Sequence, residues 1–261
     1  MIYKSSKKFA NGCVYLFNTD DGYPLEVTDT FLPYYTKNAI GNHQNALTGV
    51  DLGSRKDRWM VGVSTMSGCP VGCKFCATGK LKRCRNLTTD EIVQQVQEIW
   101  DRNLGWWVDG AKEFKINYTR MGEPFLNIDN VKGAIRHLSE YNPKIHHYVS
   151  TIGVKGSDFS WIKGNVSLQF SIHSFDENYR NWLIPFKNKM TLEEIGKVRT
   201  KSNLKTTLNL TLTRPEDFDI NELKRHFDPE HFFIKLSPIN PNDMSTKNGM
   251  KDGVIHQQNM I

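Results

Sequence analysis

An α/β fold is predicted for this chain, in the form of a partial (β/α)6 TIM-type barrel with an N-terminal β-hairpin extension. Three observations predict it: strand and helix patterns alternate along most of the sequence, helix patterns carry an apolar stripe, and a turn signal divides the N-terminal strands. Alternation of this kind favours a parallel sheet whose functional residues gather at the carboxyl ends of the strands. A chain of 261 residues is long enough for one such core.

The N-terminal region is expected to be a hairpin followed by a loop. Residues 12–18 and 23–32 alternate between apolar and polar side chains. Between them, Asp21-Gly22 is typical of a tight turn. Residues 35–58 are polar and irregular, which indicates a loop.

Six β/α units are expected to follow the loop. Residues 59–66 predict the first core strand, and Thr88 with Glu91 forms a capping box that starts the first helix. The apolar residues from Ile92 to Trp100 then recur at the spacing of one helix face. The remaining strands are expected at 113–119, 145–151, 165–172, 203–212 and 231–237, and the helices or helical turns at 128–140, 157–162, 191–201 and 218–226. The predicted domains are an extension over 1–58, the barrel over 59–241 and a C-terminal tail over 242–261.

Composition limits the class of protein and its partners. The hydrophobic fraction of 38% and a mean hydropathy of -0.52 fit a globular protein, and no apolar run reaches the 18 or so residues of a membrane span. The N-terminus lacks the apolar core of a signal peptide, so we expect a cytoplasmic protein. A net charge of +6 favours a polyanionic partner such as nucleic acid, although a lysine-rich solvated surface gives the same value.

Three of the five cysteines stand close together with the spacing C-x3-C-x2-C, at Cys69, Cys73 and Cys76. Thiolate is a soft ligand, so the pattern indicates an iron–sulfur cluster or zinc. A structural zinc site needs four ligands, and the fourth would be Cys84 or a remote histidine. Burial of the cysteines as small apolar side chains is the third alternative, and it suits a loop rich in glycine, proline and lysine poorly.

The loop resembles the signature of the radical S-adenosylmethionine (SAM) superfamily, in which an aromatic residue precedes the last cysteine, as Phe75 does here. More narrowly, Val63-Ser64-Thr65 before the loop and Ala77-Thr78-Gly79-Lys80 after it are similar to the RlmN and Cfr enzymes, which methylate adenosine in ribosomal RNA. The resemblance implies a 4Fe-4S cluster on the three cysteines, with one iron left for S-adenosyl-L-methionine. It also implies an electron donor such as flavodoxin or ferredoxin, and a nucleic acid or nucleotide substrate.

The resemblance further implies that residues at the strand ends bind SAM. Gly122 and Glu123, after the second core strand, correspond to the segment that binds the SAM amino group. Arg120 departs from this pattern, because the family usually has glycine at that position. The other cofactor-binding residues implied by the resemblance are Phe75, Ser150, Ser171, Ile172, His173 and Asn240.

Two cysteines of the methylating relatives have no counterpart here. The position seven residues before Cys69 is Gly62, and no cysteine follows Asn240. The relatives also carry a carboxylate on their hairpin. Glu26 and Asp29 are both candidates for this position, and their spacing does not decide between them.

Three function hypotheses follow. The leading one is a radical SAM enzyme that cleaves SAM reductively and abstracts hydrogen from a substrate. It does not use the thioether relay of the relatives, in which one of the two further cysteines carries the methyl group. The alternative is an RlmN/Cfr-like RNA adenosine methyltransferase whose relay cysteines have moved to Cys13 or Cys84. A zinc-stabilised nucleic-acid-binding module without catalysis is the third.

Overall fold

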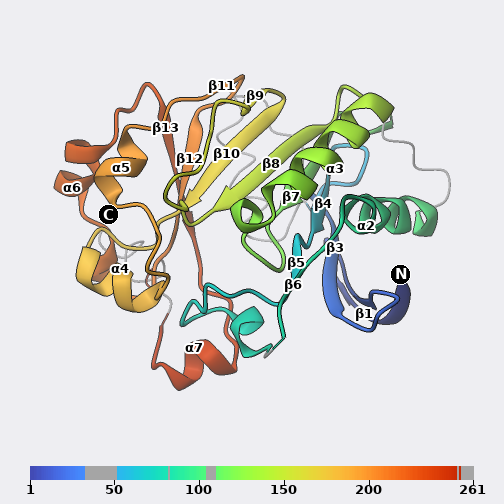
Figure 1. The fold of residues 1–261 in the computed structure, drawn as a ribbon, viewed down its shortest axis with the longest axis horizontal. Helices are drawn as coiled ribbons and strands as arrows, with labels where there is room; N and C mark the ends of the chain where they lie inside the picture. The colour runs from blue at the N-terminus through green and yellow to red at the C-terminus, as the bar shows by residue number, and fades with distance from the viewer. Residues whose placement is uncertain (33–51, 82, 104–109, 252, 254–261) are drawn as a thin grey trace. The chain divides into compact units, whose positions relative to one another are not determined.

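The computed structural model describes residues 1–32, 52–81, 83–103, 110–251 and 253, and it is shown in Figure 1. Most of the loop expected over 35–58 and the end of the expected tail lie outside these residues. The chain divides into two compact units, Met1–Ser67 with Arg85–Tyr148 (unit 1) and Gly68–Cys84 with Val149–Ile261 (unit 2). The division expected at residues 58 and 241 stays a prediction. None of the described helices has both the length and the apolar character of a membrane-crossing segment.

The sheet of unit 1 begins with the N-terminal strands. Its strands are β1 (Ile2–Phe9), β2 (Gly12–Asn18), β3 (Pro24–Leu32), β4 (Arg58–Val63), β7 (Glu113–Tyr118) and the first half of β8 (His146–Thr151), in that order. Strands β1 to β4 pair antiparallel, and β4 pairs parallel with β7. The predicted hairpin is confirmed as β2 and β3. Strand β1 was not predicted, because its residues are all exposed and it forms through backbone pairing rather than apolar burial.

Two helices of unit 1 cover one face of this sheet. Helix α2 (Thr89–Arg102) starts at the predicted capping box, in which Glu91 N donates to Thr88 Oγ1 over 3.2 Å and Thr88 N donates to Glu91 Oε2 over 2.8 Å. Helix α3 (Ile128–Tyr141) lies beside α2 (Figure 1). The buried stripe of α2 contains the predicted apolar residues from Ile92 to Ile99, whereas Trp100 is half-buried. The strand residues Trp59 and Phe114 are buried in the same core, and their rings are 4.9 Å apart.

The two faces of the unit 1 sheet follow from strand alternation. The covered face carries fully buried side chains, among them Leu25, Val27, Val61 and Ile116. The alternate residues form the polar face, which carries Glu26, Thr28, Arg58, Met60, Gly62, Glu113, Lys115, Asn117, His146 and Tyr148. Charges therefore gather on the face that the helices do not cover.

Unit 2 contains the later strands and shorter helices. The second half of β8, β10 (Val166–Ser171), β12 (Thr206–Thr211) and β13 (Phe232–Ser237) are neighbours in that order, and β12 pairs parallel with β10 and β13. Its helices are α4 (Glu177–Leu183), α5 (Leu192–Gly196), α6 (Ile220–His226) and α7 (Asp243–Lys247).

Several predicted elements differ from the observed ones. The helix expected over 191–201 ends at Gly196, and Lys201–Ser202 instead forms β11, which pairs with β9 (Lys163–Gly164). The helical turn expected over 157–162 is irregular, because the Asp158 carboxylate accepts a hydrogen bond from Ser160 N and fixes a tight turn. Helix α4 was missed since its sequence has no apolar run, and the Asp176 side chain caps it.

Candidate active site

The cysteine-bearing segment leaves unit 1 after a short strand and returns to it through another. Strand β5 (Met66–Ser67) pairs antiparallel with β6 (Arg85–Asn86), which closes the base of the excursion formed by residues 68–84. The strand predicted over 59–66 is therefore two elements, because β4 ends at Val63. Pairing at the base holds the ends of the segment together.

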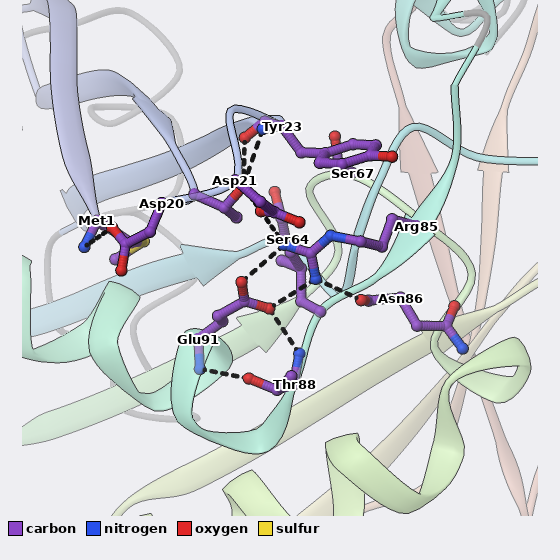
Figure 2. Close-up of polar contacts among 12 residues, drawn as sticks. Met1, Asp20, Asp21, Tyr23, Ser64, Ser67, Arg85, Asn86, Thr88 and Glu91 are labelled. Carbon is purple, nitrogen blue, oxygen red and sulfur yellow. Dashed lines mark hydrogen bonds and ion pairs between the residues drawn. The ribbon is translucent and has the colours of Figure 1, made fainter.

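Arg85 fastens this base to two other elements of unit 1 (Figure 2). Its guanidinium makes two hydrogen bonds to the Glu91 carboxylate, over 3.0 and 2.7 Å, and a third to Asp21 Oδ1 over 2.8 Å. It also lies 5.0 Å from the centre of the Tyr23 ring. Burial raises the pKa of Glu91, but the hydrogen bonds from Arg85 and Thr88 N and the positive charge of Arg85 together outweigh it, so the net pKa lies below its usual value. Arg85 thus joins β6 to the hairpin turn and to the first turn of α2.

The cysteine loop itself belongs to unit 2. Cys69, Cys73 and Cys76 are partly exposed, and none is in a disulfide. The loop turns at two glycines with left-handed backbones, Gly68 at φ 75° and Gly72 at φ 69°. A Cβ on Gly68 would stand 2.6 Å from the Arg83 carbonyl oxygen, so glycine is required there by both conformation and space.

Three polar contacts within unit 2 hold the backbone of this loop. Asn242 Nδ2 donates to the Phe75 carbonyl over 2.9 Å, and Asn248 Nδ2 donates to the Lys74 carbonyl over 2.8 Å. Lys74 N donates to the carbonyl of Leu183, at the end of α4, over 2.9 Å. Sequence reasoning missed both asparagines. The signal for Asn242 was its capping box with Ser245 at the start of α7.

Two of the predicted serines meet at the ends of neighbouring strands. Ser150 Oγ and Ser171 Oγ lie 3.3 Å apart, and Gln169 Nε2 donates to Ser150 Oγ over 2.9 Å. All three side chains are partly exposed. Asn209, which the sequence did not single out, stands opposite Ser171 on β12, and its Oδ1 accepts from Ser237 Oγ over 2.8 Å. Hydroxyl and amide groups therefore line adjacent strand ends, as expected where a polar ligand binds.

His173 connects the end of β10 to the cysteine loop. Within the described ranges it is the one non-glycine residue in a positive φ conformation, at 60°. Its ring lies edge-on to Phe75 at 4.8 Å between centroids, and its Nδ1 accepts a hydrogen bond from Thr211 N over 3.0 Å. An accepting Nδ1 leaves the ring proton on Nε2. Such a backbone conformation, held from several sides, is typical of functional positions.

Burial keeps the His173 side chain neutral. Loss of solvent lowers its pKa to about 3, and the nearby Arg180 charge acts in the same direction. Arg180 is itself fully buried, and it donates to the carbonyls of Met190 over 2.8 Å and Ile152 over 3.3 Å. The neutral ring can donate one hydrogen bond from Nε2 without carrying a charge.

Two further predicted residues differ in exposure. Ile172 is fully buried, and its N donates to the Asn209 carbonyl over 3.1 Å. Asn240 is exposed, and its carbonyl accepts from Asn242 Nδ2 over 3.0 Å. Their roles as cofactor-binding residues stay predictions.

Gly122 and Glu123 lie in unit 1, after β7. A Cβ on Gly122 would stand 2.6 Å from Met66 Cβ, and its φ is 102°, so the segment packs against β5 as only glycine allows. Glu123 is 3% exposed, and its Oε1 accepts from Phe125 N over 3.1 Å. The predicted site residues thus come from both units, and their convergence on one cofactor stays a prediction.

The two residues that depart from the family pattern, Gly62 and Arg120, lie against each other in unit 1. A Cβ on Gly62 would lie 2.3 Å from Thr28 Oγ1 and 3.0 Å from Arg120 Cδ. The Arg120 guanidinium then forms an ion pair with Glu26. The space beside Gly62 is therefore filled by a threonine hydroxyl and an arginine stem, and no side chain fits there without rearrangement.

The two candidate carboxylates of the N-terminal hairpin differ in their surroundings, and Asp29 is part of the buried core. Asp29 is fully buried on the covered face, where it accepts from Arg55 over 2.7 and 3.1 Å, from Trp59 Nε1 over 2.8 Å and from Asn103 Nδ2 over 3.1 Å. Glu26, by contrast, lies on the polar face next to Arg120. Of the two, only the Glu26 carboxylate is accessible to solvent.

The remaining cysteines also differ. Cys13 is buried on the covered face, opposite Asp29. Cys84 is exposed, and its Sγ lies 3.0 Å from the position of a Cβ on Gly68, immediately before the first cysteine of the loop. The thiol of Cys84 therefore neighbours the loop in unit 2.

The donor set of the cysteine loop fits an iron–sulfur cluster. Three soft thiols come from one loop, and the described residues include no group of three or more side chains that converge on a single metal ion. Soft thiolates are the ligands that iron–sulfur clusters take.

Comparisons with known proteins agree with this chemistry. A crystal structure titled as a radical SAM methyltransferase from Sphaerobacter thermophilus superposes with a TM-score of 0.67 at 25% identity, over 92% of this chain and 67% of the other. The predicted α/β class and partial-barrel fold are thereby confirmed. The family model described as the radical SAM superfamily matches residues 63–226, more than half of the chain. The chain therefore belongs to the radical SAM superfamily.

Individual relatives show which enzymes within the superfamily this chain resembles. The chain is 31% identical over 198 residues to a protein of Thermotoga neapolitana, and 38% identical over 151 residues to one of Dictyoglomus turgidum, both named probable dual-specificity RNA methyltransferase RlmN. The matches cover 69% and 54% of this chain, and 54% and 42% of the relatives. The chain thus spans about half the length of these relatives. It is an enzyme of the superfamily, whose cofactors are a 4Fe-4S cluster and S-adenosyl-L-methionine.

Proposed function

We propose that this enzyme uses a cluster held by Cys69, Cys73 and Cys76 to act on an RNA substrate by hydrogen abstraction. The observation that carries the proposal is the cysteine loop, with its glycine turns, its two asparagine-held carbonyls and its contact between Phe75 and His173. When bound, the cluster supplies an electron for reductive cleavage of SAM to methionine and a 5′-deoxyadenosyl radical. An electron donor such as flavodoxin or ferredoxin would reduce the cluster.

The residues of this chain would bind and orient SAM. Glu123 offers a carboxylate for the amino group, and Gly122 allows close approach of the backbone. Ser150 and Ser171 offer hydroxyls at the strand ends. The neutral His173 can donate from Nε2, while buried Ile172 and exposed Asn240 complete the proposed nucleoside and carboxylate contacts.

An RNA substrate is favoured by charge and by the relatives. The chain carries a net charge of +6, and the relatives are named RNA methyltransferases. The filled space beside Gly62 disfavours a relay thiol at that position. We therefore favour hydrogen abstraction over the thioether relay.

A second candidate function is RNA adenosine methylation with a relocated relay cysteine. Its support is Cys84, which is exposed and neighbours Gly68 at the start of the cysteine loop. Cys13 does not support it, since that thiol is buried on the face of unit 1 that the helices cover.

Anaerobic reconstitution with iron and sulfide tests the proposal. We expect a brown protein that absorbs at about 400 nm, as such clusters do, and that forms 5′-deoxyadenosine from SAM and a reductant. Cys76→Ala should abolish both signals, while Cys84→Ala, the matched control, should retain them. Loss of the cluster in Cys84→Ala, or its retention in Cys76→Ala, would contradict the ligand assignment. Mass spectrometry that finds a methyl group on Cys84 would favour the second function.

A further inference from the structure

We propose that the polar face of the N-terminal strands binds a single-stranded segment of the RNA substrate. This surface lies on β1 and β2. We call it the hairpin face and define it by Ile2, Lys7, Phe9 and Leu16. The inference rests on the proposed function, because it takes RNA to be the substrate, and it adds the surface that receives it.

The strand register places these four side chains on one face. Lys7 pairs with Val14, Ser5 pairs with Leu16, and a bulge between Tyr3 and Ser5 brings Ile2 to the same side. Lys7 Nζ lies 5.3 Å from the centre of the Phe9 ring, as expected for residues two apart on a strand. Tyr3 lies on the opposite face, because its ring contacts Phe17 at 6.0 Å.

The apolar members of the hairpin face are exposed. Ile2, Phe9 and Leu16 keep 48%, 51% and 39% of their surface accessible. On the opposite face the guanidinium of Arg102 lies over the rings of Tyr3, Tyr15 and Phe17. The hairpin face thus combines an exposed aromatic ring with an adjacent lysine, which is the arrangement that stacks a base and contacts its phosphate.

Charge favours RNA over a second copy of the chain. Strand β1 carries Lys4, Lys7 and Lys8 and no acidic residue. Lysines on an edge strand oppose pairing between two copies, because like charges would meet along the new ladder. The same lysines attract the phosphates of a nucleic acid.

The hairpin face is continuous with the Arg120 ion pair. Leu16 stands opposite Glu26, and Val14 stands opposite Thr28, which stands opposite Gly62. Neighbouring strands are about 4.8 Å apart, so the row from Lys7 to Gly62 spans roughly 15 Å, or two to three nucleotides of an extended strand. The ion pair of Arg120 with Glu26 therefore lies at the inner end of this surface, and Arg120 stands two residues before Gly122.

The test compares two adjacent lysines on opposite faces. Fluorescence anisotropy with a labelled single-stranded RNA of about 15 nucleotides measures affinity against salt concentration. Lys7→Glu should weaken binding and reduce the slope of log affinity against log salt by about 1. Phe9→Ala should lower affinity about fivefold or more, which is the loss of about 1 kcal/mol of stacking. Lys8→Glu is the matched control, because it makes the same charge change on the opposite face. Its affinity should stay within about twofold of the wild type, because a charge that does not touch the RNA acts only through solvent, where salt screens it.

Four outcomes decide the inference. Crosslinking of a 4-thiouridine RNA to the β1–β2 peptide of the wild-type protein would support it without any variant. Equal weakening by Lys7→Glu and Lys8→Glu, with RNA still stimulating 5′-deoxyadenosine formation, would overturn the hairpin face and leave the proposed function standing. RNA that neither binds nor stimulates would overturn both. A wild-type dimer that Phe9→Ala converts to a monomer, with RNA affinity unchanged, would assign the face to a second copy and overturn the inference.

Discussion

The two faces of the unit 1 sheet differ in the burial and the hydrogen bonding of their charged side chains. On the covered face, Asp29 is fully buried, and each of its oxygens accepts bonds from residues such as Arg55 and Trp59. On the polar face, Glu26 and Arg120 form a pair in which the side chains remain 29% and 36% exposed. The two carboxylates are three residues apart on one strand, so alternation alone separates a charge that fixes the fold from one that a ligand can reach.

The largest expected effect breaks the covered face. Asp29→Ala leaves the Arg55 charge and the Trp59 N–H without their acceptor, so we expect a loss of about 3 kcal/mol in the free energy of unfolding. Glu26→Ala should cost less than about 1 kcal/mol, because its pair is partly exposed. Urea unfolding followed by circular dichroism measures both. Equal losses in the two variants would show that the faces do not differ in the way we describe.

The sequence predicts well those features that depend on neighbouring residues. The cysteine spacing, the Thr88–Glu91 capping box and the hairpin turn are all local, and the family match confirms the superfamily that the cysteines indicated. Strand β1 was missed because it is polar throughout, and only its pairing with β2 makes it a strand.

Features that depend on contacts between distant segments were not predictable. Gly62 and Arg120 were each noted as departures, but their shared volume depends on the pairing of β4 with β7. Likewise Asn248 donates to the Lys74 carbonyl across 174 positions of sequence. No single-sequence pattern reports a contact of that separation, because periodicity and capping signals extend over a few residues only.

A pH dependence sharpens the comparison, since His146 and His147 are adjacent and lie on opposite faces. His147 is fully buried between Tyr118 OH and Ser139 Oγ, each at 3.0 Å, and burial lowers its pKa to about 3. The unfolded chain takes up a proton near pH 6.5 that the folded protein does not, so stability falls as the pH drops from 6.5 toward 3. We expect His147 alone to contribute a loss of about 1.7 kcal/mol between pH 6.5 and 5, because the slope reaches about 1.4 kcal/mol per unit only well below pH 6.5. His173, whose pKa burial also lowers to about 3, adds a loss of similar size.

Variants assign this acid sensitivity to a face. His147→Gln should flatten the dependence of unfolding free energy on pH, in addition to any loss at neutral pH. His146→Gln should change the slope less, because that ring is half-buried and stacks on Tyr148 at 4.7 Å. Urea unfolding at intervals from pH 7.5 to 5 gives the slopes. The slope that remains in His147→Gln belongs to the second buried histidine, His173. An unchanged slope in His147→Gln would show that His147 does not stay neutral in the folded protein.

The next effect probes the polar face through its packing. Gly62→Ala places a Cβ 2.3 Å from Thr28 Oγ1, so we expect a loss of about 1–2 kcal/mol through overpacking. Thr28→Ala removes the colliding oxygen, and the double variant should recover much of the loss. A double-mutant cycle measures this coupling. Additive losses in the cycle would show that the two residues do not share the space.

The smallest expected effect on stability, and the most informative about function, belongs to Arg120. Arg120→Met keeps the aliphatic stem over Gly62 and removes the guanidinium, so the free energy of unfolding should change by less than about 0.5 kcal/mol. With RNA as the proposed substrate, we expect added RNA to increase 5′-deoxyadenosine formation by the wild type. If the pair with Glu26 meets that substrate, Arg120→Met should still cleave SAM without RNA but should not show this increase. The two assays together separate a structural arginine, whose loss lowers stability, from one that binds an anion, whose loss changes only the response to RNA. A variant that is as stable as the wild type and responds fully to RNA would exclude Arg120 from both roles, and the polar face would then contribute shape rather than charge to recognition.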